Sequence, residues 1–482
     1  MKYNNFKELE EKIGKLQIAS NHLAWDLKIN TKDSEKEHVS KRLNELNTKI
    51  FQLKNSDEYL NLVTDLINST EFSGLTPEEQ NSILRLQRKI QEYKRVPLDF
   101  YRTYDLAITA SNDAWEKAKV KNDYQIFKPH LAKVIKLTKE LYQYKNPQMN
   151  VYDAMLNDYS EGLNTTIVDE LFNKLKKELV PLIQKVKTDN VITYEKRISY
   201  NELNKAANIL LNYIGFDIKH GILGIYPHGF MEKLDVNTSA IAYSYHNDPA
   251  SFVSTIIHEG GHGIFEQNIS DTLNKYSSFT IDFFDLHEAQ SRFYENILGR
   301  NINFWLPIYD EVNKVLKLDL TVEEFVKLLN QVRPSLIRTD ADELTYALHI
   351  IVRYEIEKKI FNENVSLDEL PSIWCKLMEE YLGVTPKCDN EGLMQDVHWS
   401  DASFGYFPSY LLGNIYDGMM LEKIESDLGD VDEILESGNI KKITNYLIDY
   451  IYKNGGAYNS IEIFKKLNVN PLINYYKKKY LK

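Results

Sequence analysis

The sequence has little of what marks secreted, membrane-embedded or nucleic-acid-binding proteins. Its 482 residues include two cysteines, Cys375 and Cys388, which are too few for a disulfide framework and favour a reducing cytoplasm. No stretch approaches the roughly 18 uninterrupted apolar residues of a membrane span, and residues 1–5 lack the apolar core of a signal peptide. Acidic residues outnumber basic ones by 70 to 58, which argues against nucleic acid as a main partner. We expect a cytoplasmic protein that binds neither membrane nor nucleic acid.

Amphipathic helical patterns dominate a composition that is 43% apolar and 12% aromatic. Apolar residues recur at spacings of three and four, which is typical of helices with one buried face. This periodicity predicts helices over residues 6–16, 39–53, 79–93, 104–119, 131–144, 167–186, 322–331, 342–361 and 440–453. Residues 475–479, Tyr-Tyr-Lys-Lys-Lys, are expected to form a solvated helix end.

Strand patterns are sparse. Residues 221–226 and 240–245 are the best candidates, and they predict a short hairpin or small sheet beside a groove. No linker-like stretch or internal repeat divides the chain. We therefore predict a mainly α fold: one domain, residues 1–482, with two lobes about a deep groove and an N-terminal helical lobe of about residues 1–200 covering it.

The strongest chemical signal is His-Glu-Gly-Gly-His at residues 258–262. Asp248 and Pro249 open the helix that carries it, as N-cap and first helical residue. His258 and His262 are four residues apart, so both imidazoles stand on one face and can bind one cation. Glu259 lies beside the first histidine, where it can take a proton from an attacking water.

A chance pattern on a surface helix is the alternative interpretation. Gly260 and Gly261 argue against it, because together they cost about 1.6–2 kcal/mol of helix propensity relative to alanine. A solvent-facing helix has no reason to contain them, whereas a helix that another group approaches closely does. Six of the eleven histidines also lie between His220 and His287, which favours a functional site.

Two histidines leave a zinc site short of its third protein ligand. Asn268 occupies the position where a metzincin has its third histidine, so that class is excluded. An acidic residue on a second helix is the alternative, and residues 285–296 supply Glu288. A salt bridge between Glu288 and Arg292 explains this carboxylate equally well, and Glu295 and His287 are rival ligands.

Four ordered segments then resemble the metallocarboxypeptidase family typified by carboxypeptidase Taq, the M32 peptidases. The first is residues 257–267 around the two histidines. Residues 287–292, His-Glu-Ala-Gln-Ser-Arg, are close to the family's His-Glu-Ser-Gln-Ser-Arg. Residues 337–346 match its Ile-Arg-x-x-Ala-Asp signature, and residues 392–399 match Gly-x-x-Gln-Asp-x-His-Trp, followed by Gly-Tyr-Phe-Pro-Ser-Tyr at 405–410.

The resemblance implies that His258, His262 and Glu288 bind the metal and that Glu259 is the general base. It implies one Zn²⁺ per chain, with Co²⁺ as an alternative, in a mostly helical homodimer with a long, deep groove. The implied activity is removal of single residues from peptides with a free C-terminus.

A carboxypeptidase needs a cation for the terminal carboxylate, and an arginine fork matches both oxygens. Arg338 in the third segment is our candidate for this cation. The alternative is that Arg338 is an ordinary arginine at a helix end. Negative charge on the former carbonyl oxygen needs donors besides the metal, and His398, Tyr406 and Tyr410 can supply them. For His398 the alternative is a buried ring packed on Trp399.

Two acidic residues of these segments, Asp342 and Asp396, are better suited to orienting neighbours than to proton transfer.

One stretch departs from the family. Residues 228–230 read His-Gly-Phe for His-Pro-Phe, and residues 235–240 lack both arginines of Asp-Val-Arg-x-Thr-Thr-Arg-Tyr. If those arginines contact substrate in relatives, side-chain preference or affinity differs here.

The sequence thus predicts a zinc metallocarboxypeptidase that hydrolyses peptides without a covalent intermediate. One alternative is an endo-oligopeptidase on the same helical scaffold. The other is a non-catalytic helical protein with a structural metal. A three-ligand site with an adjacent glutamate leaves a coordination position open, which favours catalysis.

Overall fold

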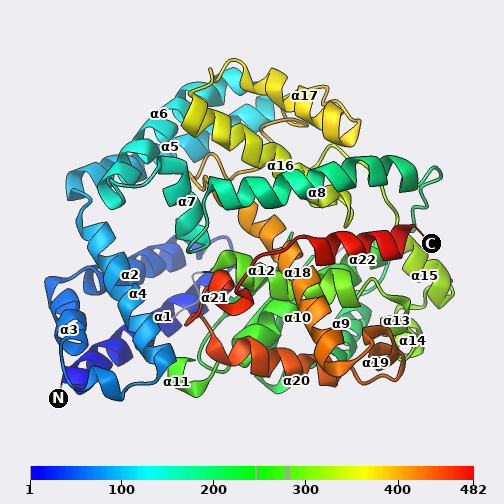
Figure 1. Ribbon diagram of the computed structural model, residues 1–482, viewed down its shortest axis with the longest axis horizontal. Helices are drawn as coiled ribbons and strands as arrows, with labels where there is room; N and C mark the ends of the chain where they lie inside the picture. Colours follow the sequence, from blue (N-terminus) through cyan, green and yellow to red (C-terminus); the bar gives the residue numbers. More distant parts are fainter. Residues whose placement is uncertain (1, 245–246, 275, 277–282, 482) are drawn as a thin grey trace.

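The computed structural model describes residues 2–244, 247–274, 276 and 283–481, and helices account for most of them (Figure 1). Each predicted helix overlaps an observed one, so the mainly α expectation is confirmed. Within these ranges no helix is both long and apolar enough to cross a bilayer.

Helices of the N-terminal region pack at one end of the molecule (Figure 1). Their starts follow from local sequence: Thr76 and Glu79 form a reciprocal capping box before a proline at the first helical position, which satisfies free backbone N–H groups. The helices are α1 (Lys2–Ile29), α2 (Lys36–Lys54), α3 (Asp57–Ile67) and α4 (Pro77–Lys94), with a 3₁₀ turn η1 (Phe72–Gly74).

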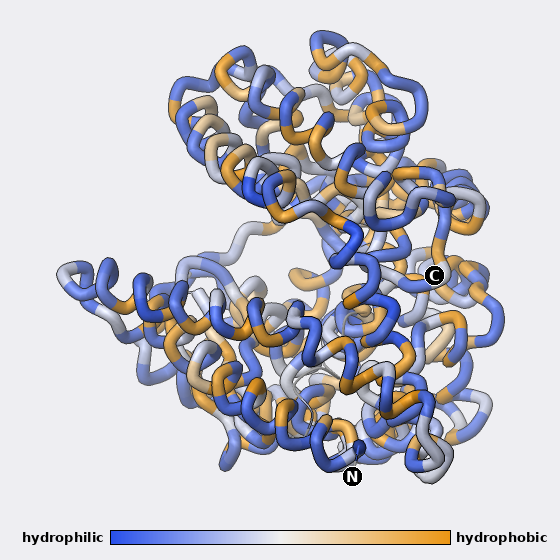
Figure 2. The backbone as a smooth tube through the Cα atoms, turned by 90° about the vertical axis from the view of Figure 1, so that its left-hand side faces the viewer, coloured by the Kyte–Doolittle hydropathy of each residue, from blue (hydrophilic) through white to orange (hydrophobic). Residues whose placement is uncertain are grey.

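A second group forms the upper part of the molecule in Figure 1. It joins segments far apart in sequence: α5 (Leu98–Lys121) and α6 (Tyr124–Lys145) with α16 (Thr345–Lys358), η6 (Lys359–Glu363) and α17 (Leu370–Leu382). Below them α7 (Val151–Tyr159) and α8 (Thr165–Val186) lead into the remainder of the fold. Figure 2 shows the backbone parting on one side into an upper and a lower arm.

The remaining helices surround α10 in the lower part (Figure 1). They are α9 (Tyr200–Ile214), α10 (Pro249–Gln267), α11 (Asp271–Asn274), α12 (Phe284–Arg292), α13 (Ile302–Trp305), α14 (Tyr309–Leu316), α15 (Val322–Leu329), α18 (Phe407–Leu428), α19 (Val431–Glu436), α20 (Ile440–Tyr450), α21 (Ser460–Phe464) and α22 (Asn470–Tyr480). Shorter turns are η2 (Ile218–His220), η4 (Phe293–Leu298), η5 (Arg338–Asp340) and η7 (Tyr452–Asn454).

A three-stranded sheet with the order β1-β3-β2 lies against α10. Strands β1 (Gly221–Ile225) and β3 (Ser239–Tyr243) correspond to the two predicted strands, although residue 245 lies outside the described residues. They pair in parallel, so of the predicted hairpin or small sheet it is the small sheet that is confirmed. The antiparallel partner of β3 is β2 (Phe230–Lys233), which the sequence did not reveal.

One large hydrophobic core runs from Tyr104 in α5 to Tyr476 in α22 and joins the upper and lower parts, while α1–α4 share a smaller core. The division into one domain with an N-terminal lobe of about residues 1–200 stays a prediction. The expected solvated end at residues 475–479 is wrong in part: Tyr476 is buried, and Lys479 Nζ donates to Glu343 Oε2 over 2.6 Å.

Candidate active site

Helix α10 holds the His-Glu-Gly-Gly-His segment at the centre of the lower part. Asp248 accepts a hydrogen bond from the Ala250 N–H and Pro249 follows it, as the sequence predicted. The two glycines are explained by close neighbours: a Cβ at Gly260 would lie 2.6 Å from Ile214 Cδ1 of α9, and Gly261 faces the backbone of α12. The low helix propensity of the two glycines predicted that another group approaches α10 closely. The groups that do so are the neighbouring helices α9 and α12, which pack against α10 on two sides.

Three predicted metal ligands converge at one point. Glu288 Oε2 lies 3.5 Å from His262 Nε2 and 3.9 Å from His258 Nε2. Bonds of about 2.1 Å in a tetrahedral site place donor atoms about 3.4 Å apart, so this set fits a zinc-sized cation. Across the described residues this is the one group of three or more His, Cys, Asp or Glu side chains with metal-binding geometry.

The Glu288 carboxylate has a geometry that suits both of the roles that the sequence left open. Its Oε1 accepts from Arg292 Nε over 2.7 Å, and its Oε2 faces the two histidines. The salt bridge thus orients the carboxylate and leaves one oxygen for a cation.

The rival ligands lie outside the triad. Glu295 Oε2 bonds the outer nitrogen of His258, Nδ1, over 2.8 Å, which turns Nε2 toward the cation position. His287 stacks on His262 with ring centroids 4.5 Å apart, and its Nε2 lies 3.2 Å from Glu266 Oε1.

Several ionisable side chains meet around this point. Burial opposes charge on His258, but Glu288 and Glu295 raise its pKa to about 9. Burial also raises the pKa of Glu259 to about 7, against the lowering effect of His258. Arg292 pairs with both Glu288 and Glu295, and Arg300 Nη2 lies 3.6 Å from Glu295 Oε1, so acidic and basic side chains together surround the cation position.

A groove of about 1100 Å³ opens over the triad. Its lining includes the three triad residues, Glu259, Arg292, Arg338, Tyr346, Tyr406 and Tyr410. A groove of this size with several converging polar groups is typical of a small-molecule or peptide site.

Arg338 begins the 3₁₀ turn η5 on the groove wall. Its Nε donates to Asp396 Oδ1 over 2.9 Å and its Nη1 to the Tyr346 hydroxyl over 3.2 Å. The guanidinium also lies 5.2 Å from the Tyr410 ring centroid. These contacts fix the fork, which an ordinary helix-end arginine does not require.

The three predicted oxyanion donors form an aromatic cluster. Tyr406 and Tyr410 line the groove, whereas His398 is absent from its lining and packs against both tyrosine rings. His398 Nε2 is 3.4 Å from the Tyr410 hydroxyl, and its ring stacks on Tyr406. Burial lowers the pKa of His398 to about 4, so its ring is neutral, and burial raises the pKa of Tyr406 to about 12, so its hydroxyl remains a donor.

The two predicted orienting acids differ in what they hold. Asp396 bonds Arg338, as described above, while Asp342 accepts from the backbone N–H groups of Arg333, Leu344 and Thr345 and so fixes the start of α16. Sequence reasoning missed the buried Arg353 and Glu357 of α16. Their charge at a buried face was the available signal, but burial itself follows from tertiary packing.

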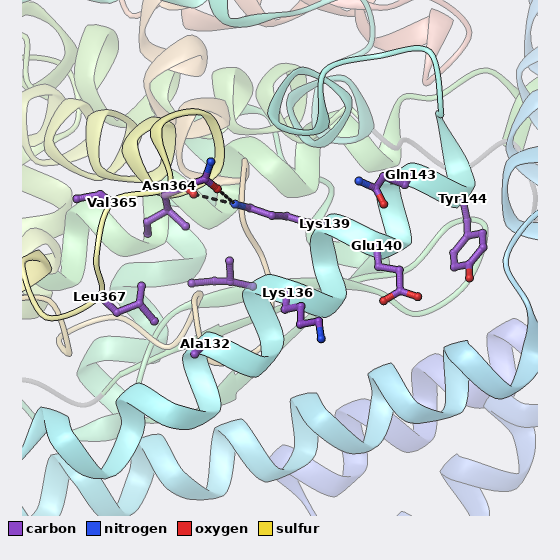
Figure 3. Close-up of a pocket in the computed structure, with 11 residues that line it drawn as sticks. Ala132, Lys136, Lys139, Glu140, Gln143, Tyr144, Asn364, Val365 and Leu367 are labelled. Atoms are coloured by element: carbon purple, nitrogen blue, oxygen red, sulfur yellow. Dashed lines mark hydrogen bonds between the residues drawn. The ribbon is translucent and has the colours of Figure 1, made fainter.

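A second pocket lies on the upper part, between α6 and the segment after η6 (Figure 3). It measures about 720 Å³. Lys139 points to Asn364 Oδ1 across a 2.7 Å hydrogen bond and also donates to the Ile360 carbonyl. Within the described residues no metal-binding triad lines this pocket, so the chemistry concentrates in the groove.

Comparisons with known proteins identify the family of this chain. The profile of the carboxypeptidase Taq (M32) metallopeptidase family matches residues 5–480. Carboxypeptidase 1 of Bacillus subtilis (strain 168) is 33% identical over 490 residues, covering 98% of this chain and 97% of that protein. The structure of Pyrococcus furiosus carboxypeptidase is 28% identical with a TM-score of 0.94, covering 100% and 99% of the two chains.

A more distant similarity shows the fold alone. A Bacillus anthracis structure assigned to oligoendopeptidase F is 10% identical with a TM-score of 0.51, covering 97% and 96% of the two chains. The fold therefore does not separate C-terminal from internal cleavage, and the family match carries that distinction.

Helical fold, groove and converging ligands define a metallopeptidase. The chain belongs to the carboxypeptidase Taq (M32) family, and it is a metallocarboxypeptidase that acts on peptides.

Proposed function

We propose that His258, His262 and Glu288 hold one zinc ion and that the surrounding residues release single amino acids from peptide C-termini. The observation that carries this proposal is the convergence of Nε2, Nε2 and Oε2 within 4.8 Å of one another. When bound, zinc supplies a Lewis acid that polarises the scissile carbonyl and makes water more acidic. Co²⁺ accepts similar ligands and is proposed as an alternative.

Glu259 is the proposed general base. It follows His258 on α10 and lines the groove beside the triad. Its carboxylate accepts a proton from the attacking water and then delivers it to the leaving amine.

Arg338 is the proposed partner of the terminal carboxylate. Asp396 and Tyr346 occupy its Nε and one side of its Nη1. Within the described residues, Nη2 makes no hydrogen bond in the groove. A carboxylate pairs with two N–H groups of one guanidinium edge, so this free edge anchors the C-terminal residue and excludes substrates whose carboxylate is blocked.

Tyr406 and Tyr410 are the proposed donors to the oxyanion. Both side chains line the groove, and burial keeps both hydroxyls protonated by raising their pKa. His398 contacts the Tyr410 hydroxyl and does not line the groove, so we propose a supporting role for it, whereas the sequence suggested a direct one.

A peptide ladder tests the function. Purified protein with zinc is incubated with peptides of mixed sequence, beside the same peptides with an amidated C-terminus, and products are followed by mass spectrometry. Stepwise loss of C-terminal residues from the free acids alone is expected. Internal cuts would instead support the endo-oligopeptidase, and no cleavage with zinc or cobalt would support the structural-metal alternative.

Glu259→Gln is the matched variant for this assay. It preserves size and hydrogen bonding but cannot accept the proton, so turnover should fall by at least about 10²-fold while the zinc content stays at the wild-type level.

The homodimer that the resemblance implies is also proposed, and sedimentation velocity tests it.

A further inference from the structure

Helix α16 carries three titratable side chains on one buried face. His349, Arg353 and Glu357 follow one another at intervals of four residues, and each is 0% exposed. Charged side chains are almost never fully buried unless they are paired. The partners of Arg353 and Glu357 therefore indicate what the buried face does.

All three guanidinium nitrogens of Arg353 donate hydrogen bonds. Nε donates to Asp396 Oδ2 over 2.7 Å, Nη2 to Gln395 Oε1 over 2.7 Å, and Nη1 to the His349 carbonyl over 2.8 Å. The group also lies 4.7 Å from the Trp374 ring centroid. An arginine held in this way has one orientation, and a lysine cannot reproduce the planar fork.

The same two acceptors hold Arg338. Asp396 Oδ1 accepts from Arg338 Nε over 2.9 Å, and Gln395 Oε1 accepts from the Arg338 backbone N–H over 2.9 Å. The Phe407 ring lies 5.3 Å from the Arg353 guanidinium and 5.7 Å from that of Arg338. Asp396 is thus a bridge with one arginine on each oxygen, one buried and one on the groove wall.

The Asp396 bridge also determines the net charge beside the groove. Two guanidinium groups and one carboxylate leave a net charge of about +1 beside the groove, by formal charge. Burial opposes ionisation of Asp396, but Arg353 and Arg338 hold its pKa well below its usual range. Without Arg353, Asp396 would neutralise Arg338 alone and reduce its attraction for a second carboxylate.

We propose that Arg353, although it does not line the groove, is a positioning residue for recognition of the substrate C-terminus. Through Asp396 and Gln395 it fixes the orientation of the Arg338 guanidinium and preserves its spare positive charge. The proposal rests on the proposed function, in which Arg338 binds the terminal carboxylate. It concerns binding of the carboxylate and leaves proton transfer at Glu259 unaffected.

The experiment compares an acid with its amide. Inhibition constants are measured for an N-acetyl amino acid and for its carboxamide, and KM and kcat for a blocked dipeptide with a free carboxylate. Arg353→Met should reduce the preference for the acid by about tenfold and raise KM by a similar factor, with kcat within about threefold of wild type. Arg353→Lys keeps the charge and should recover part of the preference.

Lys145→Met is the matched control, because Lys145 is another buried cation paired with one carboxylate, that of Asp158, and lies outside the groove lining. It should leave the preference unchanged. Two results would overturn this proposal and leave the proposed function intact. The first is a preference for the acid that Arg353→Met retains and Arg338→Met loses. The second is a lower kcat in Arg353→Met at an unchanged KM. If wild type itself shows no preference, the role of Arg338 falls and the proposal with it. Should Arg353→Met not fold, a preference in Arg353→Lys equal to that of wild type would overturn the proposal, because the lysine should recover only part of it.

Discussion

Gly261 of α10 lies against the Gln290 carbonyl of α12: a Cβ at residue 261 would be 2.8 Å from that oxygen. Contact at this distance involves rigid backbone on both sides, so a side chain cannot be accommodated by a rotamer change. The glycine therefore sets the spacing between the helix that carries His258 and His262 and the helix that carries Glu288.

Gly261→Ala should separate these two helices. We expect a loss of about 1–3 kcal/mol in the free energy of unfolding, as for other overpacked core positions, and weaker zinc binding because Glu288 moves with α12. Urea unfolding and zinc competition against a chromophoric chelator measure the two effects. Gly74→Ala is the control, since a Cβ there has nothing within 4 Å. Wild-type zinc affinity in Gly261→Ala would contradict this account of the glycine.

Glu295→Ala should weaken metal binding without removing a ligand. Glu295 Oε2 holds His258 Nδ1 at 2.8 Å, and loss of such an outer partner typically reduces metal affinity by about 10–100-fold. The same chelator competition measures it. Glu311→Ala on the exposed side of α14 is the control. An affinity equal to that of wild type would mean that His258 needs no orienting carboxylate.

Much of the fold follows from helical periodicity, because an amphipathic stripe is visible in the sequence. The Asp248 cap and the paired histidines were equally local signals. The choice between Glu288, Glu295 and His287 was not, since it depends on how α12 packs on α10. Strand β2 was missed because four half-buried residues give no alternation, and the parallel pairing of β1 and β3 depends on that missed strand.

Tyr406→Phe and Tyr410→Phe should each lower kcat. Removing one oxyanion donor typically costs about 10²–10³-fold in kcat with a smaller effect on KM. Tyr159→Phe is the control: this partly buried ring packs edge-on against Tyr406, with ring centroids 5.1 Å apart, but does not line the groove. Steady-state kinetics on one dipeptide compare the three variants. If kcat falls as much in Tyr159→Phe as in the other two, the effect is one of packing.

Glu357 should make stability depend on pH. Its carboxylate accepts from Trp399 Nε1, Gly405 N and the Tyr152 hydroxyl, but burial dominates and raises its pKa from 4.5 to about 7. The folded chain therefore holds a proton that the unfolded chain loses above pH 4.5. The stabilising contribution is complete below pH 4.5 and disappears as the pH rises through 7, by a difference on the order of 3 kcal/mol.

Glu357→Gln cannot titrate, so it isolates this contribution. The stability of wild type relative to the variant, measured by urea unfolding at pH 5, 6, 7 and 8, should be greatest at pH 5 and decline toward pH 8. A difference that does not change across this range would show that Glu357 ionises at its ordinary pKa in the folded protein.

The central claim is that one cation binds between α10 and α12. An anomalous difference map, recorded at the zinc edge from crystals grown with zinc, tests it most directly. We predict one strong peak per chain at about 2.0–2.2 Å from His258 Nε2, His262 Nε2 and Glu288 Oε2, and no such peak in Glu288→Ala. A peak elsewhere, or one that persists in that variant, would contradict the account.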